Sequence, residues 1–420
     1  MTKTYTLNFT GDVMLGRLID QLFPQHNYNE RESNIINTFQ TNYPHLSPGH
    51  YNHASPWGTA LPLFQPPSSS LNLINLETAV TTAAEPWPDK RFNYRMHPAN
   101  LEVLREGCVD FASLANNHTL DFGTEGLVET VWAVKGLGLG FAGAGESVDE
   151  CRRPAVLDLP RKVSRVSSSS SAAAGAAGAA SDSQGGRKWS EKEKHGGHGH
   201  ERFDSESNGA LTKPHKIHVY AASDHPQDWS GIPTFHLIDY SSATRRHLKS
   251  LSSTPEGQKP ALKIFSIHWG PNYTWQPSSD IRSLAHFLID ECDVDIVHGH
   301  SAHHVQGVER YKGKLIMYGC GDFVDDYALT ERFRNDLGAV WRVVVAEEDR
   351  GDSDGAGLGL RLERLEVYPT RCDRFQVTLL DGKDEDHEWV RRKITALSEE
   401  MGTVVRRELG DDGQVVVDLN

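Results

Sequence analysis

The chain has 420 residues, of which 38% are hydrophobic, so it can bury the core of one large domain or of two ordinary ones. Its formal net charge of −14 disfavours nucleic-acid binding through bulk electrostatics, and we expect no nucleic-acid partner. The 5 cysteines are widely spaced and contain no CxxC pair, which argues against a disulfide framework and fits a reducing compartment.

The N-terminal residues predict neither export nor membrane insertion. They contain no apolar stretch of signal-peptide length, and no window of the chain approaches the roughly 18 apolar residues of a membrane span. We therefore expect a soluble, cytoplasmic protein without a membrane segment.

The first predicted strand begins almost at once, because Tyr5, Leu7 and Phe9 alternate with polar residues. It ends at Gly11-Asp12, and a strand that delivers an aspartate at a glycine turn often presents that carboxylate to a metal. Arg17 follows closely and could bind an anionic group through two hydrogen bonds. A solvated surface turn is the alternative interpretation of these residues.

The next segment, 20–69, is rich in Pro, Asn, His and Tyr and lacks periodicity, which predicts a loop-rich excursion that covers the site. A second strand, Leu71–Ile74, is followed by the acidic Glu77. A third strand, Phe111–Ala115, runs into Asn116-Asn117-His118. Each strand therefore ends in side chains that can bind a metal or move a proton.

Two helices are predicted in this half of the chain, over Asn100–Glu106 and over Thr124–Lys135. A glycine-rich run follows the second helix. Since the glycines come after the helix and no Gly-Lys-Ser/Thr is present, the run predicts a helix end and a strand rather than a phosphate-binding loop.

The composition changes character between residues 161 and 213. A run of serines, a run of Ala and Gly, and then His195, His198 and His200 follow one another. Such a segment cannot bury enough apolar surface to offset the entropy of ordering, so we predict a disordered insertion in a surface loop. Its histidines would bind metal only adventitiously, because a flexible tract is a poor scaffold for catalysis.

Regular structure is predicted to resume with a strand over Ile217–Ala221. A further strand, Ala261–Ile267, ends at His268, and the amphipathic helix Ser279–Cys292 follows it. Another strand therefore delivers a potential metal ligand where it ends.

Four histidines within seven residues, 298–304, follow the short apolar strand Val294–Val297. Open α/β sheets keep their ligands at the carboxyl ends of their strands, and histidine is the commonest metal-binding side chain. The stretch therefore favours a metal site over a polar turn with solvated histidines.

The last quarter of the chain predicts further strands and one helix. The predicted elements are a strand and turn, Gly313–Phe323, a β-pair, Ala339–Ala346 and Leu360–Tyr368, joined by the Asp/Gly-rich loop 349–359, a helix over about His387–Met401, and a final strand, Gln414–Leu419.

Five strand ends thus carry side chains that can ligate a metal. They hold Asp12, Glu77, Asn117-His118, His268 and the pair His300/His303. Carboxylate and amide oxygens mixed with imidazoles suit Mn, Fe, Zn or Mg rather than a thiolate-bound zinc. Such a set can hold one or two divalent ions that share a bridging oxygen and activate a water for attack on phosphorus.

These motifs resemble those of the CapA family, proteins associated with bacterial poly-γ-glutamate capsule synthesis that have a calcineurin-like metallophosphoesterase fold. The matching blocks are Gly11-Asp12 with Arg17, Asn75–Glu77, Tyr94–Pro98, Ala115–His118 with Asp121–Gly123, His268–Gly270, Gly299–His303 and Tyr318–Phe323. They occur in the family's order and cover nearly the whole chain outside the insertion.

The resemblance implies an α/β (α+β) fold, a four-layer metallophosphoesterase-like β-sandwich flanked by helices, with the disordered insertion 161–213 inside it. We expect the CapA-like metallophosphoesterase domain to span 1–372. Residues 373–420 would add a C-terminal helix and strand packed on the same domain.

The resemblance also implies roles for individual residues. The implied metal ligands are Asp12, Glu77, Asn117, His268, His300 and His303. Two residues would be catalytic, His118 by donating a proton to the leaving oxygen and Arg17 by binding a substrate oxygen. Asn116 and His304 are further candidate substrate contacts.

Three positions depart from the superfamily pattern, and one of them, Glu77 in place of an aspartate, is what the family resemblance implies. Met14 stands where a histidine normally follows the first aspartate, and His300 and His303 are separated by one residue more than usual, because Ala302 is added. The missing histidine weakens one metal position, so the pattern allows either one or two bound ions.

Three functions are compatible with these residues. The leading hypothesis is a metal-dependent hydrolase that acts on a phosphate ester or a related small anionic substrate. The second is an accessory protein of poly-γ-glutamate synthesis or processing that acts on a γ-glutamyl polymer. The third is a catalytically degenerate scaffold or binding protein, in which Met14 and Ala302 mark lost catalysis.

Overall fold

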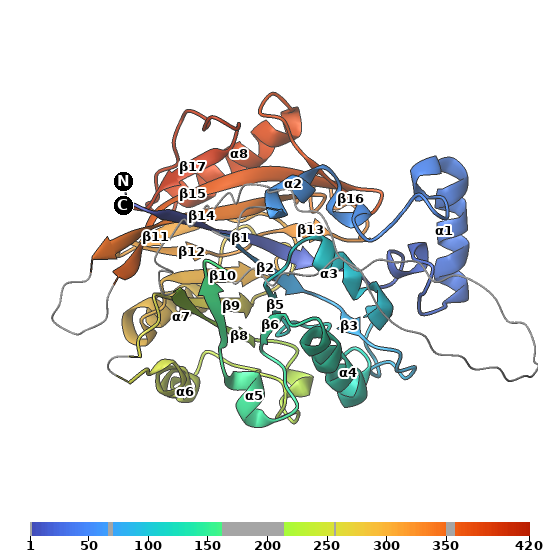
Figure 1. The fold of residues 1–420 in the computed structure, drawn as a ribbon, viewed down its shortest axis with the longest axis horizontal. Helices are drawn as coiled ribbons and strands as arrows, with labels where there is room; N and C mark the ends of the chain where they lie inside the picture. Colours follow the sequence, from blue (N-terminus) through green and yellow to red (C-terminus); the bar gives the residue numbers. More distant parts are fainter. Residues whose placement is uncertain (1, 66–69, 162–213, 256–257, 350–357) are drawn as a thin grey trace, which may run out of the picture. The chain divides into compact units, whose positions relative to one another are not determined.

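Two large β-sheets form the centre of the computed structural model, which describes residues 2–65, 70–161, 214–255, 258–349 and 358–420 (Figure 1). Among these residues, 9 strands make up the first sheet. In spatial order they are β16 (Gln376–Leu379), β15 (Leu358–Asp373), β14 (Leu337–Asp349), β1 (Thr4–Val13), β2 (Ser70–Leu76), β5 (Phe111–Ser113) and β6 (Gly140–Ala142), while β13 (Asp322–Val324) pairs with β1 and β17 (Val415–Asp418) pairs with β15.

The second sheet has 6 described strands. In spatial order they are β11 (Val308–Tyr311), β12 (Lys314–Met317), β10 (Ile296–His300), β9 (Leu262–His268), β8 (His215–Ser223) and β7 (Ala155–Leu159), and a separate small pair is formed by β3 (Ala79–Val80) and β4 (Arg95–Met96). The segment predicted as an insertion separates β7 from β8 along the chain.

Parallel pairing aligns the strand ends within each sheet. In the first sheet β1 pairs in parallel with β2 and β13, and in the second sheet β9 pairs in parallel with β8 and β10. The register places Asp12 opposite Asn75 and places His268 opposite His300. The carboxyl ends of neighbouring parallel strands therefore deliver the predicted site residues side by side.

The inner faces of the two sheets share one apolar core. Leu7 and Phe9 of β1, Val219 of β8, Ile264 of β9 and Ile296 of β10 all belong to it and are fully buried. Their alternation along each strand puts every second side chain into this core, which is why these segments form strands.

Helices cover the outer faces of both sheets (Figure 1). On the first sheet, α4 (Gly123–Gly136) packs Leu127 and Val131 into a second apolar cluster with residues of β2 and β5, next to the short α3 (Glu102–Glu106). On the second sheet, α7 (Ser279–Cys292) packs Leu284 and Leu288 against β9 and β10, with α6 (Ser242–Ser252) beside it. The predicted α/β fold, a sandwich of two sheets between helical layers, is confirmed.

Helix α7 shows how local sequence places a site strand. The Ser278 hydroxyl caps its first turn by accepting a hydrogen bond from the Ile281 N–H, 3.3 Å away. Asp293 ends the helix in the left-handed conformation, with φ of 57°. The chain then enters β10, which reaches His300 and is thus displaced toward the histidines from the predicted strand, Val294–Val297.

The C-terminal residues form α8 (Glu385–Glu399) and β17. Val390 and Ile394 of α8 are fully buried in the same core as Leu365 of β15. Strand β17 pairs antiparallel with β15, so both elements pack on the first sheet.

The expectation that 20–69 is a loop-rich excursion is wrong for one part, because α1 (Glu30–Asn42) is a 13-residue helix. Only Ile36 of α1 is buried, so the helix lacks the apolar periodicity that would reveal it. Its first turn is stabilised by Asn29, whose side chain accepts a hydrogen bond from the Glu32 N–H at 3.2 Å. The remaining short helical elements are α2 (Leu61–Phe64), α5 (Val148–Arg152), η1 (Asp20–Leu22), η2 (Pro44–Leu46), η3 (Ser55–Ala60), η4 (Pro98–Leu101) and η5 (Gln227–Trp229).

Some predicted features fall on residues beyond the described ranges. The insertion 161–213 lies outside them except for its first residue, and so does most of the predicted loop 349–359. Among the helices that are described, none has the length and apolar character needed to cross a membrane.

Candidate metal centre

Asp12 lies fully buried at the end of β1, beside the turn that leads into β13. Its backbone N–H donates to the Gly321 carbonyl at 3.0 Å. Gly11 permits this close approach, because a Cβ at that position would lie 1.8 Å from the same carbonyl oxygen. The glycine before Asp12 therefore brings β1 and β13 together, with Asp12 opposite Asp322.

Two asparagines hold the carboxylates of Asp12 and Glu77 in place. The Asn75 amide donates to Asp12 Oδ1 at 2.8 Å and to Glu77 Oε2 at 2.9 Å. The Asn116 amide donates to Asn75 Oδ1 at 3.0 Å and to the Leu76 carbonyl at 2.8 Å. The predicted substrate residue Asn116 thus lies in a supporting framework behind the carboxylates, and its amide hydrogens are already used.

The two carboxylates differ in their ease of ionisation. Burial opposes ionisation of Asp12, but the hydrogen bond and positive charge of His303 outweigh it and lower the pKa of Asp12. Burial and the neighbouring charge of Asp12 raise the pKa of Glu77 well above its usual range. Two buried carboxylates this close need either a shared proton or a cation between them.

The imidazoles of His268 and His300 meet at the ends of β9 and β10, with their Nδ1 atoms 2.8 Å apart. Burial lowers the pKa of both residues well below the usual range, so both are neutral and offer lone pairs. Behind them, His300 Nε2 is 3.0 Å from Ser266 Oγ, which contacts His298. His298 Nε2 in turn donates to the Thr10 carbonyl at 2.8 Å, so this imidazole joins the two sheets instead of facing the carboxylates.

His303 returns to the carboxylates after a tight turn in which Ser301 and His303 have positive φ, 98° and 58°. Its Nδ1 is 3.3 Å from Asp12 Oδ2 and 2.8 Å from Asp322 Oδ1. Burial opposes the charged imidazole, but Asp322 outweighs burial and raises the pKa of His303 well above its usual range. The turn thus absorbs the extra residue, Ala302, and keeps His303 next to Asp12.

Two groups of three buried side chains, among the described residues, have ligand atoms within 4.8 Å of one another. One group is Asp12, His268 and His300, and the other is Asp12, His303 and Asp322. Glu77 lies beside both, with Oε2 3.8 Å from His268 Nδ1 and Oε1 4.0 Å from His303 Nε2. The structure therefore brings five of the six predicted ligands together, and Asp322 joins them although it was not predicted.

Several polar atoms around this point are buried and have no hydrogen-bond partner among the described residues. They are Asp12 Oδ2, Glu77 Oε1, His268 Nε2, His303 Nε2 and Asp322 Oδ2. Such atoms would cost about 1–3 kcal/mol each if they stayed unpaired. A divalent cation satisfies oxygen and imidazole donors of this kind, so the residues present fit a metal. We call Asp12, Glu77, His268, His300, His303 and Asp322 the donor cluster; the sixth predicted ligand, Asn117, has a buried Oδ1 without a hydrogen-bond partner among the described residues.

His118 lies next to the donor cluster, with Nε2 3.9 Å from Glu77 Oε1. Its Nδ1–H donates to Asp121 Oδ2 at 2.6 Å, and Lys90 Nζ binds both Asp121 Oδ1 and the Asn117 carbonyl. Burial lowers the pKa of His118 to about 4 despite the opposing charge of Asp121, so Nε2 is an acceptor at neutral pH in the free protein. Asp121 could have been found from its position three residues after His118, whereas no pattern points to Lys90.

The other two predicted substrate residues have different surroundings. Arg17 Nη1 is 3.0 Å from the Tyr94 hydroxyl and 3.6 Å from Asp326 Oδ1, so its charge is already balanced, while its side chain is 21% exposed. His304 is buried between Trp275 and Phe333, with ring centroids 4.6 and 4.9 Å away. The predicted substrate contact His304 therefore lies between aromatic rings.

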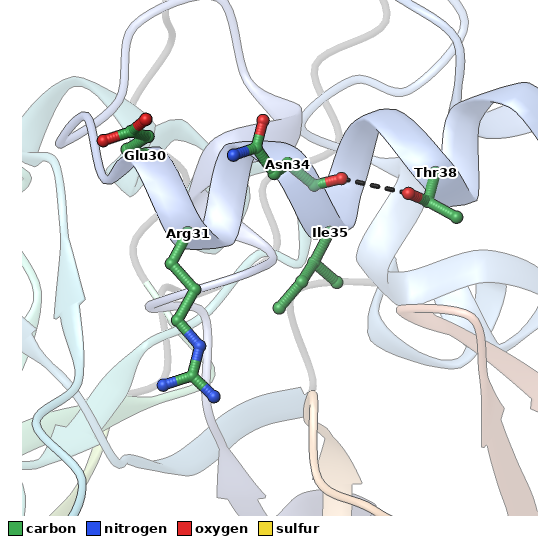
Figure 2. A pocket seen from close by; sticks show the side chains of 5 residues that line it. All are labelled: Glu30, Arg31, Asn34, Ile35 and Thr38. Atoms are coloured by element: carbon green, nitrogen blue, oxygen red, sulfur yellow. Dashed lines mark hydrogen bonds between the residues drawn. The ribbon is translucent and has the colours of Figure 1, made fainter.

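Described residues also line cavities outside the donor cluster. Figure 2 shows an open depression of about 480 Å³ on α1, lined by Glu30, Arg31, Asn34, Ile35 and Thr38. A smaller cavity of about 110 Å³ is lined in part by Trp269, Ala302 and Gln306, beside the turn that carries His303. The first contains no predicted site residue, and the second adjoins one edge of the donor cluster.

Comparisons with known proteins give one matching family model and several relatives. The family model described as "bacterial capsule synthesis protein PGA_cap" matches residues 6–327. A "probable polyglutamine synthesis accessory protein" of Mycobacterium tuberculosis is 30% identical over 410 residues, which cover 94% of this chain and 92% of the relative. The "capsule biosynthesis protein CapA" of Bacillus anthracis is 24% identical over 77% of this chain and 61% of its own, and the "PGA biosynthesis protein CapA" of Bacillus subtilis is 21% identical over 78% and 66%.

Proposed function

The chain belongs to the bacterial capsule synthesis protein family, and on that premise we propose that it is a metal-dependent hydrolase acting on a phosphate ester or a related anionic substrate. The single observation that carries this proposal is the set of buried donor atoms that have no hydrogen-bond partner among the described residues, at and just beyond strand ends of both sheets. Apolar packing and hydrogen bonding within the protein leave these atoms unsatisfied, whereas a bound cation would satisfy them.

The proposed metal ligands are those of the sequence pattern. They are Asp12, Glu77, Asn117, His268, His300 and His303. When bound, one or two ions of Mn, Fe, Zn or Mg would polarise the substrate and provide a nucleophilic water near neutral pH. The Asn75 amide would hold the first two carboxylates in position as the ion arrives.

His118 would transfer a proton at Nε2. Asp121 holds Nδ1–H and therefore points Nε2 toward Glu77 and the donor cluster. An anion bound beside the imidazole favours its protonated form, which can then donate from Nε2 to the leaving oxygen. Arg17 would contribute through the exposed part of its guanidinium, which Tyr94 and Asp326 hold in one place.

The test is turnover of phosphomonoester and phosphodiester substrates with Mn added to the purified full chain. We expect His268→Ala to lose metal affinity and activity together, and His118→Ala to keep the metal and lose turnover by about 100-fold. His45→Ala, on the surface, is the matched control. Activity that survives both site substitutions would sink the proposal.

A second candidate function is supported by the names of the relatives, which refer to polyglutamine synthesis, capsule biosynthesis and PGA biosynthesis. In this proposal the same site acts on a γ-glutamyl polymer, and the ion would polarise an amide carbonyl in place of a phosphoryl oxygen. Release of glutamate from a γ-glutamyl peptide, without release of phosphate from esters, distinguishes it from the first. A scaffold role would be indicated by purified protein that binds no metal.

We also propose how these functions map on the chain. Residues 1–372 would form the hydrolase domain, and 373–420 would complete it, because α8 and β17 pack on β15 of the same sheet. Removal of 373–420 should therefore destabilise the domain instead of releasing an independent tail.

A further inference from the structure

We propose that Asp322 replaces the histidine missing at Met14, so that the chain holds two divalent cations that share Asp12. One ion would lie between Asp12, His268 and His300, and the other between Asp12, His303 and Asp322. This inference rests on the proposed function and adds to it the number of ions and a ligand, Asp322, that is not among the ligands predicted from the sequence.

Met14 cannot act as a ligand in the second metal position. Its side chain is fully buried, and a thioether is a poor ligand for the hard ions that carboxylates select. The Met14 N–H donates to the Val324 carbonyl at 2.9 Å, which fixes β1 alongside β13. The same pairing sets Asp322 opposite Asp12, so the strand that lacks the histidine is the one held next to an additional carboxylate.

Asp12 and Asp322 both lie close to His303. Asp322 Oδ1 is 2.8 Å from His303 Nδ1, which is 3.3 Å from Asp12 Oδ2. All three residues are at most 2% exposed, and Asp12 Oδ2, Asp322 Oδ2 and His303 Nε2 have no hydrogen-bond partner among the residues that the structure describes. Two carboxylates, each with an unpaired oxygen, and one imidazole are thus grouped closely enough to form a cation position.

The charge of the buried carboxylates also favours a second cation. A single ion at His268 and His300 would leave Asp322 and the far side of Asp12 as neighbouring buried carboxylates, with the imidazole of His303 and the carboxyl of Asp325 beside them. An uncompensated buried charge is strongly destabilising, and a second cation removes the imbalance. Asp12 then lies between the two ions with one oxygen held by Asn75 and the other oriented toward His303.

A competing role for Asp322 is to orient His303 without touching an ion, because metal-bound histidines commonly donate their second N–H to a carboxylate. In that case the ion would be bound by His303 Nε2 alone on this side, and Asp322 Oδ2 would stay unpaired. The unpaired oxygen favours the ligand role, and the experiment below separates the two.

The test counts ions in the full chain after saturation with Mn and gel filtration, and records the electron paramagnetic resonance spectrum. We expect two Mn per wild-type chain with a spin-coupled spectrum, and one Mn with an uncoupled spectrum in Asp322→Asn. If wild type binds one Mn, the inference fails and the proposed hydrolase stands; if it binds none, the proposed function fails as well. Two coupled ions in Asp322→Asn also overturn the inference.

A second variant distinguishes a ligand from an orienting residue and remains informative if Asp322→Asn does not fold. In Asp322→Cys with Cd added, direct ligation creates a cadmium–thiolate charge-transfer band above the wild-type spectrum. Asp20→Cys, which replaces a buried carboxylate bound to the His97 N–H and the Asn100 amide, is the control and should show no such band. A folded Asp322→Cys without the band overturns the ligand role.

Discussion

The two sheets contribute chemically different halves of the donor cluster. The first sheet supplies oxygen atoms from Asp12, Glu77 and Asp322, while the second supplies the nitrogen atoms of His268 and His300. In the oxygen half, Asp12 and Glu77 are held by amide hydrogen bonds, whereas the nitrogen half is held by strand register and by the contact of His300 with Ser266. Each half alone carries unsatisfied charge or lone pairs, so a cation between them would stabilise both.

The two halves also differ in whether a ligand belongs to one or to both of the groups of three residues. Asp12 belongs to both groups of ligand atoms, but His268 belongs to one. Loss of Asp12 should therefore cost more than loss of His268. The following substitutions test this asymmetry, beginning with the largest expected effect.

Asp12→Asn should remove both ions and lower turnover by at least about 1,000-fold, because it removes the only carboxylate common to the two groups. His268→Ala should remove one ion and leave the other. Metal content and kcat, measured on the same preparations, check the prediction. Equal ion loss in the two variants would show that Asp12 is not shared.

Asn75→Ala should break the oxygen half without removing a ligand. Its amide donates to both Asp12 and Glu77, and a hydrogen bond to a charged group such as the Asp12 carboxylate contributes about 1.5–3 kcal/mol. We expect a loss of about 3 kcal/mol in the free energy of unfolding and a 10- to 100-fold weaker metal affinity. Urea titration and Mn titration measure the two quantities.

The control for Asn75→Ala is Asn8→Ala, in the neighbouring strand of the same sheet. Asn8 is also fully buried, and its amide donates to Asn72 Oδ1 at 2.8 Å and to the Leu63 carbonyl at 3.1 Å. It should lose stability and keep its metal affinity. If both variants lose metal affinity equally, the effect comes from the sheet and not from the carboxylates.

The same asymmetry explains which site residues can be predicted from sequence. Asp12, His268 and His300 each end an apolar strand, and parallel pairing then brings those ends together. Asp322 escapes this reasoning because the apolar strand before it ends at Met317 and a turn intervenes. The Gly321-Asp322 pair, which repeats the pattern of Gly11-Asp12, is the sequence signal that points to Asp322 as a ligand.

Other features depend on side-chain direction and tertiary pairing, which spacing does not encode. Asn116 was expected to contact substrate, but its amide faces Asn75 and the Leu76 carbonyl. The four-layer fold follows from the apolar strands and the family motifs, whereas the position of β14 between β1 and β15 comes from long-range pairing. Helix α1 was missed since it is polar and depends on a cap.

A buried imidazole outside the donor cluster, His236, provides a pH-dependent contrast with the cluster. Burial lowers the pKa of His236 to about 4, against the opposing hydrogen bond from its Nδ1 to the Ala221 carbonyl. An unfolded histidine has a pKa of about 6.5, so between these values the unfolded chain binds a proton that the folded chain does not. The stability contributed by neutral His236 is complete above pH 6.5 and is lost as the pH falls toward 4.

In His236→Asn, the free energy of unfolding should therefore fall less steeply with decreasing pH, so that the loss between pH 6.5 and 4 is smaller by on the order of 3 kcal/mol. The charged groups that face it are His247 and Arg152, which both disfavour its protonation. Urea titrations at several pH values, with and without Mn, measure the effect. The smaller loss should not depend on Mn, since His236 lies outside the donor cluster, and His45→Asn on the surface should leave the pH dependence unchanged.

The smallest effect is expected at Lys90, which touches the cluster only through other residues. Its Nζ binds Asp121 and the Asn117 carbonyl and lies 3.2 Å from His118 Nδ1, so it holds the groups that orient the imidazole. Lys90→Met should lower kcat by about tenfold and leave the number of bound ions unchanged. Lys135→Met, which removes a lysine paired with Glu146 and Glu150 on the surface, should leave kcat unchanged. A loss of ions in Lys90→Met would instead show that Lys90 helps to hold the oxygen half, through Asn117. The two halves would then differ in their supporting contacts as well as in their ligands.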